Sequence, residues 1–264
     1  MDFLVQRAVK MSFSAVARNG GHKRPYNLIH SNEDVLFKSA RIAPVLWGVH
    51  VVDLSPQGLL VELNGTAFQE SRREALLDIF SKSQSIVFRH CLGTPELLSL
   101  LAQSHSPIQN VTIITRNESI HEKLQIVGGQ CPHLKKLSWL RLMGDKRAMI
   151  SPVLRVMPGL TTIILSAPHF ENVTTFSTHA NIRKITLHLD GVLDLDRYLP
   201  QFLKAFPQLQ SLKLYEPSSL TDKGLSAMAL SCSTLRKCHL ISHAKAQPFS
   251  VDGVNAFLSY CSGL

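Results

Sequence analysis

The side chains best suited to chemistry in this sequence are lysines, histidines and hydroxyls that recur within short apolar segments. The segments follow the pattern apolar-x-x-apolar-x-apolar, and the polar residues lie between the apolar ones or directly after the last of them. The set consists of Lys136, Ser138, Thr162, Lys184, Thr186, His188, Lys213, Tyr215, Lys237 and His239. It contains no acid, and ammonium and hydroxyl groups donate hydrogen bonds to carboxylate and phosphate oxygens. We therefore expect these residues to bind an acidic or phosphorylated protein segment.

The cysteines and histidines do not have the spacing of a nucleophilic or metal site. His90 and Cys91 are adjacent, and adjacent strand residues face opposite sides of a sheet, which disfavours a thiolate–imidazole pair. Cys131, Cys232 and Cys261 recur once per repeat, as expected for small buried residues. No cysteine has zinc-ligand spacing with a histidine, and the glycine motifs of phosphate- and dinucleotide-binding loops are absent. We expect no catalysis, no metal and no cofactor.

The composition is that of a folded, basic protein. The chain has 264 residues, of which 45% are hydrophobic and 18% charged, and its formal net charge is +9. No apolar run reaches the roughly 18 residues of a membrane span, and the first residues have no signal-peptide pattern. The five cysteines include no C-x-x-C pair, which favours a reducing compartment. We expect a cytoplasmic or nuclear protein with no membrane partner.

An internal repeat sets the positions of these residues. Its apolar-x-x-apolar-x-apolar segments begin at Ile108, Leu134, Leu160, Ile182, Leu209 and Leu235, so that successive starts are 26, 26, 22, 27 and 26 residues apart. Apolar residues also lie 10, 7, 6 and 3 positions before each start, for example Leu199, Phe202, Leu203 and Phe206 before Leu209. This second spacing marks one face of a helix, whereas the segment itself has the period of a strand.

Each repeat is therefore predicted to contain a strand, a turn and a helix. Stacked units bury a continuous core between a parallel sheet and a row of helices, and the crossovers between parallel strands are right-handed. The polar set then points outward on the concave side of the sheet. Helices are expected to start at Thr94-Pro95 and Thr221-Asp222. Residues 166–180 are too short for a full helix and predict a loop or single turn.

The repeat continues in weaker form toward both ends of the chain. Upstream, Leu76, Leu77 and Phe80 precede a strand containing Ile86 and Phe88, and Ile42, Ala43 and Leu46 precede Val49, Val52 and Leu54. We interpret these as two degenerate repeats. Leu264 occupies the first position of a strand that is not completed, which predicts an uncapped edge prone to self-association.

Two stretches resemble the cysteine-containing subclass of leucine-rich repeats. They run from Leu220 to Leu235, with Cys232, and from Val254 to Leu264, with Cys261, and Cys131-Pro-His-Leu134 repeats their ending. The resemblance implies an α/β fold, a right-handed leucine-rich-repeat solenoid over residues 46–264, with a parallel concave sheet and helices on the convex side. This type of repeat is similar to the repeat domain of F-box substrate receptors in SCF-type (cullin–RING) ubiquitin ligases.

The N-terminal side adds to this resemblance. The segment from Ile42 to Leu54, with its Leu46-Trp47 pair, resembles the junction that follows an F-box. Residues 1–45 are therefore expected to be a helical segment, a degenerate or truncated F-box, with the Skp adaptor as its partner. The implied function is that of a substrate-recognition subunit that binds a protein and performs no reaction.

A basic repeat protein associated with RNA or ribonucleoprotein is the alternative. The net charge and the four lysines of the polar set favour it. Tyr215 is the single aromatic residue of that set, whereas proteins that bind single strands stack bases on several aromatic rings. Nucleic acid is therefore the less favoured partner, and the salt dependence of binding distinguishes the two classes.

Overall fold

The computed structural model describes residues 49–53, 59–65, 68–115, 120–141, 150–166, 178–242 and 249–261, with the main chain alone for residues 49–53 and 141. The predicted F-box segment, the Leu46-Trp47 junction and Leu264 lie outside these residues. So does most of the loop or turn predicted at 166–180.

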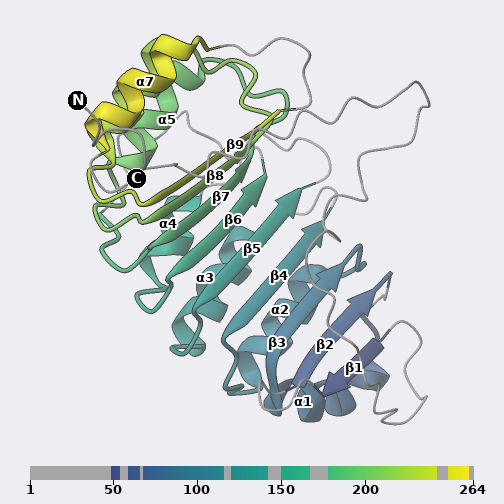
Figure 1. Ribbon diagram of the computed structural model, residues 1–264. Coiled ribbons are helices and arrows are strands. Elements are labelled where there is room, and N and C mark those ends of the chain that lie inside the picture. Colours follow the sequence, from purple (N-terminus) through teal and green to yellow (C-terminus); the bar gives the residue numbers. More distant parts are fainter. Residues whose placement is uncertain are drawn as a thin grey trace, which may run out of the picture.

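Within the described ranges, one sheet of nine strands follows the order of the chain (Figure 1). The strands are β1 (Val49–Asp53), β2 (Leu59–Asn64), β3 (Ser83–Arg89), β4 (Asn110–Thr115), β5 (Lys136–Arg141), β6 (Thr162–Ser166), β7 (Lys184–His188), β8 (Ser211–Tyr215) and β9 (Lys237–Ile241). Every neighbouring pair from β2 to β9 is parallel. A sheet built in this way needs a crossover after each strand.

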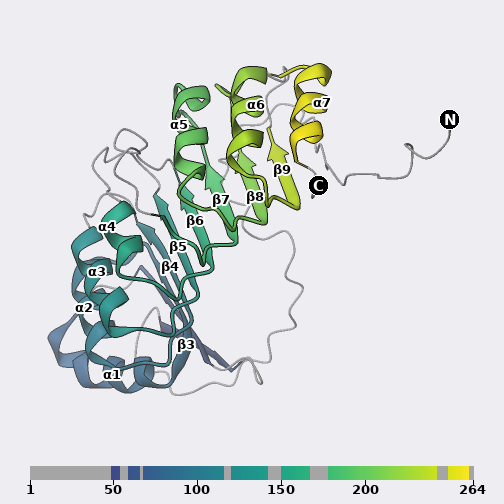
Figure 2. The same ribbon diagram turned by 90° about the vertical axis from the view of Figure 1, so that its left-hand side faces the viewer.

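Helices supply these crossovers apart from the one between β6 and β7, where residues 167–177 lie outside the described ranges, and they cover one face of the sheet (Figures 1 and 2). They are α1 (Arg73–Ser81), which follows a 3-10 turn at Glu70–Arg72, and α2 (Thr94–Gln103), α3 (His121–Gln130), α4 (Ile150–Arg155), α5 (Leu195–Leu203), α6 (Asp222–Ser231) and α7 (Val251–Tyr260). Strand and helix alternate along the arc, with the sheet on its concave side. This arrangement confirms the predicted α/β leucine-rich-repeat solenoid.

The core lies between the sheet and the helices, as the two periods predicted. The inward strand positions are all buried: Val111, Ile113, Leu137, Trp139, Ile163, Leu165, Ile185, Leu187, Leu212, Leu214, Cys238 and Leu240. The helical stripe of α5 is equally buried, since Leu199, Phe202 and Leu203 are 0% exposed. Burial of both surfaces supplies the main driving force for stacking the units.

The first part of the repeat differs from its prediction. β1, predicted to be a degenerate repeat, pairs antiparallel with β2, so the two strands need no helical crossover. The first parallel unit instead begins at β2, where Val61 and Leu63 align with Ile86 and Phe88 of β3. β2 itself was not predicted; its Leu59 aligns with Ser83 of β3, and the register shifts between Leu59 and Leu60.

Helix capping also differs from the simple expectation. Thr94 is the first residue of α2, follows Gly93 (φ 79°), and donates its hydroxyl proton to the carbonyl of Cys91 at 3.0 Å. Thr221 does precede α6, but its side chain makes no bond to its own helix and donates to Asp196 of α5. The predicted helix starts are thus correct to within one residue, while the hydroxyls serve other parts of the chain.

The Thr221–Asp196 bond belongs to a ladder that joins the last three helices. The Thr221 N–H also donates to Asp196 at 2.7 Å, and one repeat later the N–H and the hydroxyl of Ser250 each donate to Asp222 at 2.7 Å. A glycine, Gly224, lies against the Asp196 carboxylate, where a Cβ atom would collide. Each aspartate therefore holds the beginning of the next helix and fixes the stacking of α5, α6 and α7.

Candidate functional site

The ten predicted site residues lie on the face of the sheet that the helices leave uncovered. The register of the strands arranges this face in three rows that run across the sheet. The first row is Lys136, Thr162, Lys184, Ser211 and Lys237; the second is Ser138, Ile164, Thr186, Lys213 and His239; the third is Ser166, His188, Tyr215 and Ile241. The structure therefore brings all ten residues onto one surface between β5 and β9.

Lysines and hydroxyls alternate along the first row. Lys184 and Lys237 are exposed, while Lys136, Thr162 and Ser211 are half-buried. Neighbouring strands are about 4.8 Å apart, so the lysines on β5, β7 and β9 recur at intervals of about 9.5 Å. A single anion cannot contact all three, whereas an extended anionic chain can.

A second set of cations lies at the same edge of the sheet, and the sequence analysis missed it. Lys135, Arg183 and Arg236 each precede a lysine of the first row and are exposed. Their main chain is held by a regular ladder; for example, the N–H groups of Arg183 and Lys184 both donate to the carbonyl of Thr161, at 2.9 and 3.1 Å. The pairs Lys-Lys, Arg-Lys and Arg-Lys at the start of alternate strands are the sequence signal for this basic edge.

The positive charge of this edge is not compensated by nearby acids. The ion pairs found among the described residues are Arg73–Glu70, Lys82–Asp78 and Arg89–Glu62. None of them involves the first row or the three cations that precede it. Unpaired ammonium and guanidinium groups repel each other, and an anionic ligand relieves that repulsion.

The second row adds one lysine and one histidine. The Lys213 ammonium lies 4.8 Å from the centre of the Tyr215 ring, within the range of a cation–π contact. The pKa of His239 is lowered by burial first and then by the charges of Lys213 and Lys237. Its imidazole is therefore neutral at pH 7, and the lysines alone supply the charge at this point.

Ser138 differs from the other predicted site residues, because its side chain is only 3% exposed. It lies between Thr112 and Ile164 in the register, and both of these neighbours carry larger side chains. Ser138 thus lies on the concave side but exposes little surface to a partner, and its role in binding stays a prediction.

The third row contains a stacked pair of rings. His188 and Tyr215 lie with their ring centres 4.5 Å apart and an angle of 8° between their planes. Burial and the charge of Lys213 lower the pKa of His188, which keeps its ring neutral. The two rings form a flat surface beside the lysines, larger than the lone tyrosine that the sequence analysis expected.

The opposite end of the concave face pairs its charged side chains within the chain. Arg89 donates to the Glu62 carboxylate at 2.8 Å, and the Asn110 side chain donates to the Ser85 hydroxyl at 2.8 Å. The lysines without an acidic partner among the described residues begin at β5, which limits the candidate site to the C-terminal half of the face.

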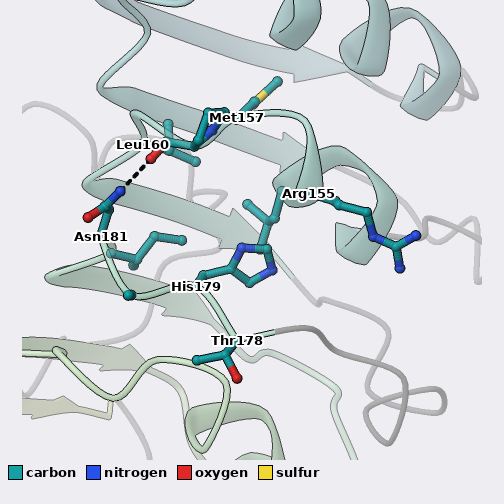
Figure 3. A pocket seen from close by; sticks show the side chains of 10 residues that line it. Arg155, Met157, Leu160, Thr178, His179 and Asn181 are labelled. Carbon is teal, nitrogen blue, oxygen red and sulfur yellow. Dashed lines mark hydrogen bonds between the residues drawn. The ribbon is translucent and has the colours of Figure 1, made fainter.

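A cavity of about 300 Å³ lies on the other side of the sheet, next to the end of α4 (Figure 3). Two of its polar groups have structural roles: the Asn181 side chain donates to the carbonyl of Pro158 at 2.7 Å, and the main-chain N–H of His179 donates to the carbonyl of Ala205 at 2.7 Å. The Arg155 guanidinium extends away from the His179 ring. The cavity therefore offers no convergent set of groups for a ligand.

The five cysteines are buried free thiols, as predicted for structural residues. Burial raises the pKa of Cys131 to about 11, and burial together with the nearby Cys261 raises that of Cys232 to about 12. Thiols of this kind are poor nucleophiles at neutral pH, because the thiolate is the reactive form. Among the described residues, no group of three or more histidines, cysteines or acids is placed to hold a metal ion.

Comparison with solved structures adds a likeness in fold. No protein-family model matches the chain, and neither does any curated protein. The chain is similar to the solved structure of the leucine-rich-repeat-containing protein LegL7 from Legionella pneumophila, with 11% identity, a TM-score of 0.45, and coverage of 77% of this chain and 81% of that one. No helix in the described ranges is long and apolar enough to cross a membrane.

Proposed function

We propose that this chain is a protein-binding scaffold whose concave face, between β5 and β9, holds an acidic or phosphorylated segment of a partner protein. The observation that carries the proposal is the first row, in which Lys136, Lys184 and Lys237 alternate with hydroxyls and have no acidic partner among the described residues. Hydrogen bonds from charged donors to carboxylate or phosphate are roughly twice as strong as neutral ones.

A binding measurement tests this proposal directly. Fluorescence anisotropy with a labelled peptide rich in glutamate or phosphoserine should show binding to the native chain. Lys184→Glu should lower the affinity by about tenfold or more, since it removes one charge-assisted contact and adds a repulsive one. Lys223→Glu is the matched control, because Lys223 is exposed on α6 at the convex side. Equal losses in both variants would show that only net charge matters.

The finer proposal is a substrate-recognition subunit of an SCF-type ubiquitin ligase, located in the cytoplasm or nucleus. In this proposal residues 46–264 hold the substrate and residues 1–45 contact the Skp adaptor. Its support is the resemblance of the cysteine-containing repeats and of the Leu46-Trp47 junction to F-box receptors. A pull-down with the Skp adaptor tests it: binding by the full chain and loss of binding by a chain starting at Leu46 would support the adaptor role.

Association with RNA is the second candidate, supported by the basic edge formed by Lys135, Arg183 and Arg236. The stacked His188–Tyr215 pair offers one aromatic platform, whereas single-strand binding uses a series of them. An affinity for unrelated RNAs that falls steeply with salt and exceeds the affinity for acidic peptides would favour this function over the first.

A further inference from the structure

The spacing of the first row specifies the form of the ligand as well as its charge. We infer that the bound segment runs across the strands as a polyproline II helix with an acidic or phosphorylated residue at every third position. This inference rests on the proposed function and adds to it the conformation and the charge pattern of the partner segment.

The distance between the lysines comes from the register of the sheet. Lys136, Lys184 and Lys237 are in one register row on alternate strands, with Thr162 and Ser211 on the strands between them. At about 4.8 Å per strand, the lysines are about 9.5 Å apart and the row spans about 19 Å. Lys213 does not interrupt the series, because its ammonium lies over the Tyr215 ring in the next row.

A polyproline II helix matches this distance. It has three residues per turn and rises about 3.1 Å per residue, so every third side chain points the same way at intervals of about 9.3 Å. Two turns cover about 18.6 Å, close to the full length of the row.

Other regular conformations fit the row less well. In an extended strand, side chains on one side recur every two residues, at about 6.6 Å, and every third residue points to the opposite side. In an α-helix, the repeat nearest in length is seven residues, about 10.5 Å, so the mismatch grows to about 2 Å over the row. The polyproline II form is the one that stays in phase over all three lysines.

The hydroxyls between the lysines support the same conclusion. Thr162 and Ser211 are half-buried, and among the described residues no hydrogen bond from either hydroxyl is found. A polyproline II helix has no internal hydrogen bonds, so its main-chain carbonyls are free to accept from such hydroxyls. The row thus offers donors for the side chains of the ligand at the lysines and donors for its main chain between them.

Four labelled peptides of equal net charge test the inference on the full chain. The first has three glutamates at every third position separated by prolines, Glu-Pro-Pro-Glu-Pro-Pro-Glu. The second and third have the same composition with the glutamates at every second position or adjacent to each other. The fourth is an alanine-rich helical peptide with glutamates at every seventh position. Anisotropy titrations at fixed salt then give four affinities for the native chain.

We expect the first peptide to bind about tenfold more tightly than each of the others. Lys184→Gln removes the middle lysine and should abolish this preference, while Lys223→Gln should retain it. Equal binding of all four peptides, or tighter binding of the helical one, would overturn the inference and leave the proposed function intact. Binding that is undetectable, or unchanged when all three lysines are replaced by glutamine, would overturn the proposed function itself. A far-UV circular dichroism melt confirms that each variant is folded.

Discussion

Replacing Leu212 with alanine removes a side chain at the centre of β8 that is 0% exposed. Its neighbours in the register, Ile185 and Cys238, are buried as well, so the surrounding core consists of side chains held on rigid strands. Such surroundings collapse only partly into the space left by a truncated leucine. The expected cost is about 2–5 kcal/mol in the free energy of unfolding.

The next residue along the strand is the natural control. Lys213 faces the opposite side of the sheet and is half-buried, and its main interaction is the cation–π contact with Tyr215. Lys213→Ala should therefore cost at most about 1 kcal/mol, the sum of an ordinary surface change and the lost contact. The two substitutions differ by one position in sequence and by at least a factor of two in effect.

Urea denaturation followed by circular dichroism measures this difference. With a urea dependence of about 3 kcal/mol per molar, a loss of 3 kcal/mol shifts the midpoint by about 1 M, whereas the lysine variant should shift it by about 0.3 M or less. Equal small shifts for Leu212→Ala and Lys213→Ala would refute the assignment of inward and outward positions. The placement of the lysine rows on the concave face would be refuted as well, because it rests on the same two-residue period.

Three further predictions concern the helix ladder, the thiols and the histidines. Gly224→Ala should lower the melting temperature, because the added Cβ atom would collide with the Asp196 carboxylate; the expected cost is about 1–3 kcal/mol in the free energy of unfolding. Gly129→Ala is the control: Gly129 lies in α3 with open space around it, so this change should be neutral or stabilising by up to about 1 kcal/mol. Burial raises the pKa of Cys131 from 9.0 to about 11, so the thiol should react with a disulfide reagent at pH 8 only after unfolding. The stability that the buried neutral thiol contributes below pH 9 should be lost as the pH rises toward 11. The pKa of His239 is lowered by burial and by lysine charges, so it should titrate below 6.5 by NMR, and Lys213→Gln should raise it.

The repeat and the side of the sheet on which each residue lies could be predicted from the sequence, because both depend on periods of apolar residues. That His188 and Tyr215 lie side by side on adjacent strands follows from the same periods. They are 27 positions apart, which is also the distance between the repeat starts Ile182 and Leu209. The stacking of their rings depends on side-chain rotamers, which no apolar pattern contains. For the same reason the burial of Ser138 could not be read from its position alone: it results from the sizes of the side chains on the adjacent strands.

The helix ladder was beyond the sequence analysis for a different reason. The bond from Thr221 to Asp196 joins residues 25 positions apart, and neither residue is unusual for the start of a helix. Hydroxyl residues in that position ordinarily cap their own helix. Only after the units are stacked does the carboxylate of the preceding helix lie close enough to accept both donors.

The two halves of the concave face differ in how their charged side chains are paired. Between β2 and β4, the pairs Arg89–Glu62 and Asn110–Ser85 satisfy polar groups within the chain. Between β5 and β9, the lysines repel each other and the hydroxyls of Thr162 and Ser211 donate to no described residue, while the core beneath is as well buried as elsewhere. These side chains contribute little to stability, and their mutual repulsion opposes it. A regular array of donors that contributes little to the stability of the fold is what the proposed binding of an anionic segment needs.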